Sequence, residues 1–128
     1  MTFHVTALYA SILAIAGIVL SIIVSTKRGK VGVAILDGGN ADLAVWMRRH
    51  GNFVEYVPFT LFMMALAEAV GMQPRWIHVI GIVLLISRLI HPIGLNATYP
   101  ANPLRVLGAV GTHLCVLACV VFLLWSLT

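Results

Sequence analysis

The sequence turns from polar to apolar within one stretch, Arg48-Arg49-His50-Gly51-Asn52-Phe53-Val54-Glu55-Tyr56-Val57-Pro58. On a helix, positions 48, 52, 55 and 59 share one face because they are four, three and four residues apart. A charge at the centre of a membrane helix costs about 2.5–3.5 kcal/mol on insertion scales, and it is tolerated where it faces a bundle interior or a wet cavity. The stretch therefore predicts a polar ligand site near one membrane surface.

The composition indicates a membrane protein. Of the 128 residues, 61% are hydrophobic and 9% are charged, whereas soluble domains carry about 25% charged residues. A membrane-spanning helix needs about 20 residues, so the chain has room for four spans with short loops. We expect an all-α fold, a single integral membrane four-helix bundle over residues 1–128. The predicted spans cover about residues 5–24, 41–70, 76–93 and 104–127.

Features at the helix ends add two expectations. Asn40 or Asp42 is predicted to cap the second helix, because both side chains accept hydrogen bonds from the free N–H groups of a first turn. Glu68 lies about 200° around the helix from Arg48, at 100° per residue. Since Arg75 follows closely in the sequence, we expect Glu68 to form an ion pair with it at the opposite membrane surface.

The positions of the cations predict the orientation. Basic residues gather in the first loop and flank the third, while the second loop offers only Arg75 and the termini have none. The positive-inside rule then places the first and third loops in the cytoplasm and both termini outside. The net charge of +4 thus indicates topology and not a nucleic-acid partner. Short loops favour a protein of a bacterial inner membrane.

This topology gathers six polar side chains at the cytoplasmic side: Arg48, Asn52, Glu55, Arg88, His91 and Arg105. Guanidinium groups bind carboxylates through paired hydrogen bonds, and Glu55 suits an ammonium group. A peptide-like zwitterion therefore fits better than a phosphate, which Glu55 would repel. A structural network of mutually neutralised charges is the alternative. We expect no metal site, and a haem between His50 and His91 has weak support.

Three residues of the fourth helix are expected to pack. Cys115 and Cys119 are four residues apart within an apolar run, and free cysteines commonly behave as small apolar residues. His113 is a lone histidine on the same helix, for which a packing or interfacial role is more frequent than a ligand role.

The residues Arg48, His50, Asn52, Glu55 and Pro58, in the second helix of a four-span chain, resemble the MAPEG family of membrane-associated proteins in eicosanoid and glutathione metabolism. The specific part is the pattern Arg-x-x-x-Asn-x-x-Glu-x-x-Pro. The pair Arg88-x-x-His91 and Arg105 at the start of the fourth span add support. The resemblance covers the whole chain in length, number of spans and topology.

The resemblance implies a homotrimer that binds glutathione as co-substrate between neighbouring subunits, near the cytoplasmic surface. The implied glutathione-binding residues are Arg48, His50, Asn52, Glu55, Tyr56, Arg88 and His91. Arg105 resembles the family's arginine that stabilises the glutathione thiolate, and is the implied catalytic residue. A nearby cation raises the thiolate fraction of a thiol whose free pKa is about 8.5. Arg28 resembles a further arginine at the end of the first helix.

One departure bears on activity. Family members commonly carry a tyrosine one turn after the position of His91, where this chain has Leu95, and Tyr99 in the following loop is the nearest substitute. The expected function is a glutathione transferase or peroxidase acting on a lipophilic substrate from the bilayer. The alternative is a non-catalytic module that binds a small zwitterion. A small multidrug-type transporter is disfavoured, since such a protein would carry a carboxylate in its first span.

Overall fold

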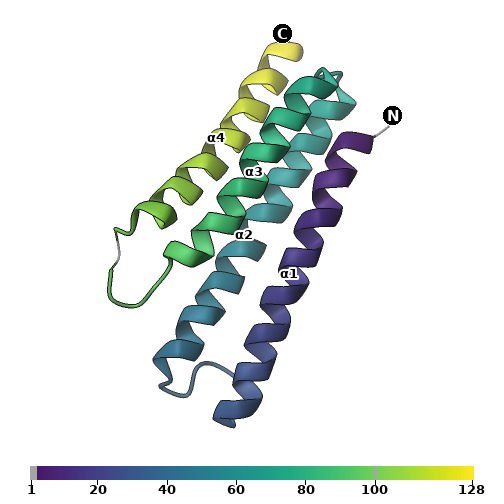
Figure 1. The fold of residues 1–128 in the computed structure, drawn as a ribbon. Helices are drawn as coiled ribbons and strands as arrows, with labels where there is room; N and C mark the ends of the chain where they lie inside the picture. Colours follow the sequence, from purple (N-terminus) through teal and green to yellow (C-terminus); the bar gives the residue numbers. More distant parts are fainter. Residues whose placement is uncertain (1–2, 100) are drawn as a thin grey trace.

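The computed structural model describes residues 3–99 and 101–128, and four helices hold most of them. They are α1 (His4–Val31), α2 (Ala41–Ala69), α3 (Pro74–Gly94) and α4 (Pro103–Ser126). Consecutive helices run in opposite directions (Figure 1), so α1 and α3 point one way and α2 and α4 the other. The all-α fold with four helices is confirmed.

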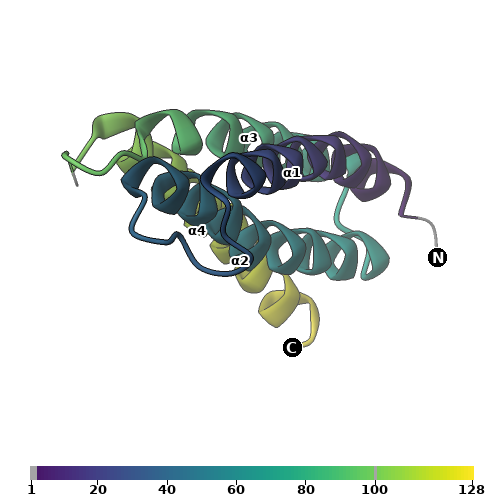
Figure 2. The same ribbon diagram turned by 90° about the horizontal axis from the view of Figure 1, so that it is seen from below.

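The helices form two layers, with α1 beside α3 and α2 beside α4 (Figure 2). The α3–α4 and α1–α2 pairs make the most extensive contacts, whereas α1 and α4 lie on a diagonal and their backbones do not approach each other closely in the described residues. The core lies between the layers and is built from apolar side chains such as Leu13, Phe53, Met64 and Ile77.

Three helices, α1, α3 and α4, are long and apolar enough to cross a membrane. Their outward faces remain apolar: Ile15, Ile93 and Leu107 are each at least 60% exposed. Helix α2 falls short of that composition because it carries five charged residues: Asp42, Arg48, Arg49, Glu55 and Glu68. Helix α2 runs antiparallel to α1 and α3 and packs against both (Figure 1). The chain is an integral membrane protein.

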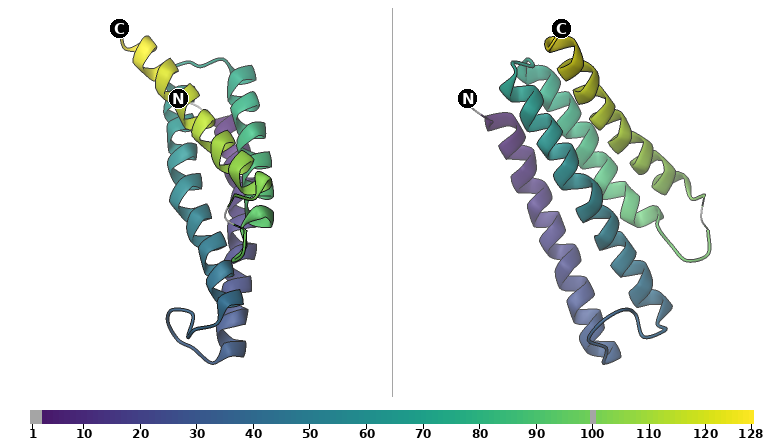
Figure 3. Two further views of the ribbon diagram at one scale, coloured as in Figure 1. Left: turned by 90° about the vertical axis from the view of Figure 1, so that its left-hand side faces the viewer. Right: turned by 180° about the vertical axis from the view of Figure 1, so that it is seen from behind.

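The two ends of the bundle differ in charge. We call the end where α1 and α3 finish and α2 and α4 begin the basic end, and the end with both termini the terminal end (Figure 1). At the basic end α1 and α2 extend beyond α3 and α4 (Figure 3). Lys27 on α1 forms an ion pair with Asp42 on α2 there.

Helix α1 runs seven residues past the predicted end of the first span at Val24. Cations mark the membrane surface but do not break a helix. Gly32, with φ of 76°, adopts the left-handed conformation that ends helices, and its N–H donates to the Arg28 carbonyl at 2.9 Å. In α2, the Asn40 side chain accepts from the Leu43 N–H at 2.9 Å, so Asn40 is the cap.

The predicted ion pair between Glu68 and Arg75 is wrong. The Glu68 carboxylate instead accepts the backbone N–H groups of Val5 and Thr6 at 3.0 and 2.9 Å. The guanidinium of Arg75 lies 5.3 Å from the centroid of the Trp76 ring. The first N–H groups of a helix have no partner within the helix and carry partial positive charge. Glu68 therefore caps α1 from the end of α2.

Candidate ligand site on α2, α3 and α4

Arg48 and Glu55 form a two-bond ion pair along α2. Nη1 of Arg48 donates to Oε1 of Glu55 at 2.9 Å, and Nη2 donates to Oε2 at 3.3 Å. The side chains are 58% and 48% exposed. The pair therefore lies on a face of α2 that the other helices of the chain leave open.

The bond that Arg49 makes to the end of α3 indicates how deep the Arg48–Glu55 pair lies in the membrane. Its Nε and Nη2 donate to the carbonyl of Leu95, directly after α3, at 3.2 and 2.9 Å. The 21 residues of α3 span about 31 Å, close to the hydrocarbon thickness of about 30 Å. Glu55 lies about 9 Å further along α2 than Arg49, at 1.5 Å per residue. The open ion pair thus extends below the membrane surface, where exposure to lipid is costly.

Arg88 links three helices beneath this face. The Arg88 side chain, on α3, is buried, with 3% of the residue exposed. Its Nη1 donates to Oδ1 of Asn52 on α2 at 3.0 Å, and its Nη2 donates to the carbonyl of Gly108 on α4 at 2.7 Å. Neither ion pair in the described part of the chain includes Arg88, and its Nε is buried without a hydrogen-bond partner. The site thus contains a buried cation held by neutral acceptors, which favours an anionic ligand nearby.

A small cavity of about 40 Å³ lies against Arg88 and is lined by Asn52, Tyr56, Arg88, Ala109 and His113. This volume exceeds the roughly 10–15 Å³ that one water molecule needs. His113 is exposed on α4 and its ring meets that of Tyr56 edge-on, with centroids 5.5 Å apart. The contact agrees with the expected packing role, but His113 also belongs to the cavity. Its ionisable ring within an apolar span was the signal for a site residue.

A larger cavity of about 250 Å³ lies at the basic end, lined by Ala44, Val45, Arg48, Leu95, Asn96 and Arg105. Two basic residues from different helices, Arg48 on α2 and Arg105 on α4, thus border the same cavity. Arginine side chains near one cavity suit a ligand with carboxylates or a thiolate.

The structure places most of the predicted site residues at one or the other of these two cavities. Asn52, Tyr56 and Arg88 line the small cavity, while Arg48 and Arg105 line the larger one and Glu55 pairs with Arg48.

Two predicted site residues, His50 and His91, line neither cavity. His91 is 3% exposed and packs against Gly108, where an added Cβ would lie 2.7 Å from the His91 Cβ. His50 lines neither cavity and lies about 200° around α2 from Arg48. Their roles as ligand contacts stay predictions.

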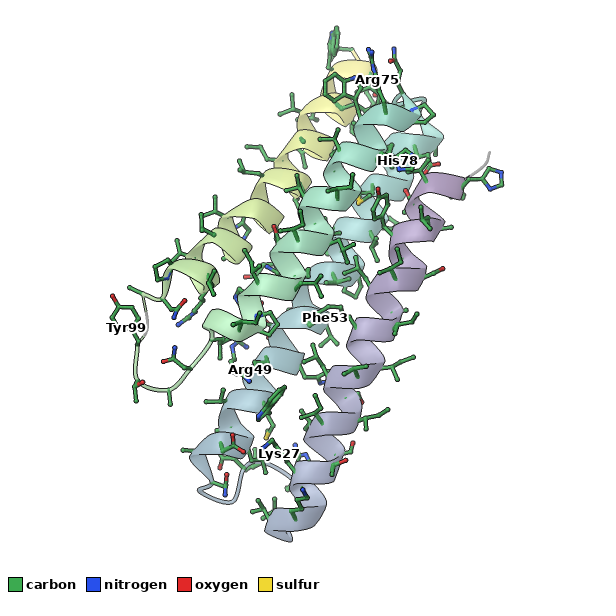
Figure 4. The ribbon with its side chains drawn as sticks, in the orientation of Figure 1. Lys27, Arg49, Phe53, Arg75, His78 and Tyr99 are labelled. Carbon is green, nitrogen blue, oxygen red and sulfur yellow. The ribbon has the colours of Figure 1, made fainter. Side chains whose placement is uncertain are left out.

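Leu95 stands where family members commonly carry a tyrosine, and the structure shows where Leu95 and the possible substitute Tyr99 lie. Leu95 is 6% exposed and lines the larger cavity. Tyr99 is 57% exposed, and its side chain points away from the helices (Figure 4). Within one chain, Tyr99 does not replace the missing tyrosine. Arg28 donates to the Ala34 carbonyl at 3.1 Å and thereby holds the first loop.

The open polar face on α2, carried by a four-helix membrane bundle, defines the class of protein. The chain belongs to the MAPEG family, which it matches over residues 6–125. It is 39% identical over 92 residues to the inner membrane protein YecN of Escherichia coli strain K12, an alignment that covers 72% of this chain and 70% of that protein. The YecN protein of Escherichia coli O6:H1 gives the same values. The resemblance to the family is confirmed.

Proposed function

We propose that this protein binds glutathione on the open face of α2 and activates its thiol to attack, or to reduce, a lipophilic substrate from the bilayer. The observation that carries the proposal is the Arg48–Glu55 pair, half exposed at a depth where lipid cannot solvate it. Glutathione has two carboxylates and one ammonium group, so it can satisfy both members of the pair. Family membership supports the same ligand.

The proposed roles follow the two cavities. Arg48 and Glu55 bind the charged groups of the peptide, while Asn52 and Tyr56 contact its backbone. Arg105 faces the larger cavity from the first turn of α4 and is the proposed stabiliser of the thiolate. Arg88 holds Asn52 in place from below. His50 and His91 are retained as the remaining proposed glutathione contacts.

The functional form we propose is a homotrimer. A face with an exposed ion pair inside the membrane must be covered, and a neighbouring subunit can cover it while leaving space for the ligand. The exposed apolar residues Val54, Phe59 and Phe62 on α2 supply additional contact area. By the positive-inside rule, the basic end and its cavities face the cytoplasm of a bacterial cell, and both termini face outward.

A second candidate function is a non-catalytic membrane module that binds the same zwitterion. The observation that favours it is the exposed position of Tyr99 together with the apolar side chain of Leu95 in the larger cavity. Such a module would keep the binding residues but lack a hydroxyl group next to the thiol.

Turnover separates the two candidates. The trimer in detergent is mixed with glutathione and either 1-chloro-2,4-dinitrobenzene or cumene hydroperoxide. The enzyme hypothesis expects product formation above the uncatalysed rate with at least one substrate, and its loss in Arg105→Ala. Glutathione binding without turnover of either substrate would favour the binding module.

A further inference from the structure

A mostly apolar groove of about 360 Å³ opens between α1, α2 and α3. Its apolar walls include Val19, Leu20 and Ile23 on α1, Phe53 on α2, and Leu89 and Pro92 on α3. Arg88 lines it too and is the one residue that the groove shares with the small cavity. Val19 and Leu89 are 50% and 53% exposed, so the groove is open along its length.

The groove and the ion pair lie on different sides of α2. Phe53 is about 140° and Trp46 about 160° around the helix from Arg48, at 100° per residue. Covering the Arg48–Glu55 face therefore does not require covering the groove.

The groove runs in the direction of a lipid tail. It follows α1 from Ile23 to Ala16, a rise of about 10 Å along a helix that crosses the membrane. Arg49 lies level with the end of α3, because it bonds the Leu95 carbonyl. Along α2, Phe53 lies about 6 Å deeper in the membrane than Arg49, and Trp46 lies about 4.5 Å closer to the membrane surface than Arg49. The groove thus begins at headgroup level and continues into the hydrocarbon.

Cations surround the outer end of the groove. Trp46 lines it there, with Nζ of Lys27 at 5.7 Å and Cζ of Arg49 at 4.4 Å from its ring centroid. Phe53, Arg49 and Lys27 follow one another toward the basic end (Figure 4), with Arg49 on α2 beside the end of α3. Asp42, paired with Lys27, is the carboxylate at this rim. Two cations against one carboxylate leave net positive charge at headgroup depth.

We propose that this groove binds one acyl chain of an anionic phospholipid from the surrounding bilayer, with the phosphate of the headgroup beside Lys27 and Arg49. Basic pockets between membrane helices recognise anionic headgroups, and apolar walls next to them accept the tail. The lipid site goes beyond the proposed glutathione chemistry and does not depend on it.

Fluorescence quenching of Trp46 tests the site. The chain has three tryptophans, and Trp76→Phe with Trp125→Phe leaves Trp46 alone. The full-length protein is reconstituted in phosphatidylcholine bilayers that contain increasing fractions of brominated phosphatidylglycerol or, separately, brominated phosphatidylcholine. We expect the anionic lipid to bind about fivefold more tightly, the effect of one cation at a membrane surface.

Matched variants locate the lipid. Val19→Phe fills the groove and should reduce quenching, whereas Ile18→Phe, on a neighbouring exposed position that does not line the groove, should not. Lys27→Gln should lower the preference for phosphatidylglycerol, and Lys30→Gln, at the same end of α1, should leave it unchanged.

Three results would each overturn the proposal. Equal quenching by both lipids would show that the site does not select an anionic headgroup. Equal effects of Val19→Phe and Ile18→Phe would show that the lipid does not lie in the groove. Protection of Trp46 from both lipids would mean that protein, most simply a second copy of the chain, fills the space.

Discussion

Nη1 of Arg88 donates to Oδ1 of Asn52 across 3.0 Å, and this bond fixes the polar face of α2 against the buried cation of α3. Arg88 is 3% exposed and reaches α4 through the Gly108 carbonyl. The same side chains that hold three helices together therefore form the floor of the proposed glutathione site. Stability and binding are expected to be coupled at this point.

A double-mutant cycle on Asn52 and Arg88 measures that coupling. Asn52→Ala leaves a buried charged donor without its partner, which costs about 1–3 kcal/mol. Arg88→Met removes the donor, so adding Asn52→Ala to it should cost much less. Unfolding in mixed detergent micelles, followed by circular dichroism, gives the four free energies. Additive effects would show that the bond contributes nothing to stability.

Glu68→Ala should destabilise the bundle without affecting the proposed site. The substitution removes the acceptor for the N–H groups of Val5 and Thr6, and losing a helix cap costs about 0.5–2 kcal/mol. Thermal unfolding in detergent checks the stability. Arg75→Ala is the control. A larger loss of thermal stability in Arg75→Ala than in Glu68→Ala would contradict the capping role and favour an ion pair between Glu68 and Arg75.

Close contact between α3 and α4 at Gly108 predicts a sensitive position. A Cβ there would lie 2.7 Å from both the His91 Cβ and the Ser87 carbonyl oxygen, so Gly108→Ala should cost about 1–3 kcal/mol through overpacking. Gly29 on α1 has no atom within 4 Å of an added Cβ. Gly29→Ala should be neutral or stabilising by up to about 1 kcal/mol. Equal melting temperatures for the two variants would contradict the packing.

Arg105→Ala should keep glutathione binding but lose the thiolate. Removing a cation beside the thiol returns its pKa toward the free value of about 8.5, so the ultraviolet absorbance of the bound thiolate disappears at neutral pH. Arg105→Lys should restore part of the band because it retains the charge. An unchanged band in Arg105→Ala would assign the thiolate to another residue, with Arg48 in the same cavity the first to test.

The fold was largely predictable because apolar runs of membrane-spanning length dominate the chain. The predicted spans match the helices closely except at α1, where cations were taken as its end and Gly32 in fact ends it. Glu68 was placed wrongly because sequence proximity favoured Arg75. Its partners are 62 and 63 residues away, and a contact of that kind depends on how α1 packs beside α2.

The candidate site was predictable in composition but only in part in arrangement. Helical spacing placed Arg48, Asn52 and Glu55 on one face, which the structure confirms through the Arg48–Glu55 pair. It could not show that Arg88 would be buried or that His91 would pack on Gly108. Those outcomes depend on the rotation of α3 against α4, which a single sequence does not specify.

Titration calorimetry of glutathione into the detergent-purified protein tests the central claim most directly, with Glu55→Ala as the site variant and Glu68→Ala as a control on the same helix. We expect glutathione to bind to the wild type and to Glu68→Ala, but not to Glu55→Ala. Absence of binding to folded wild-type protein, or equal binding by both variants, would contradict the proposed site and leave the polar face of α2 as a structural charge network.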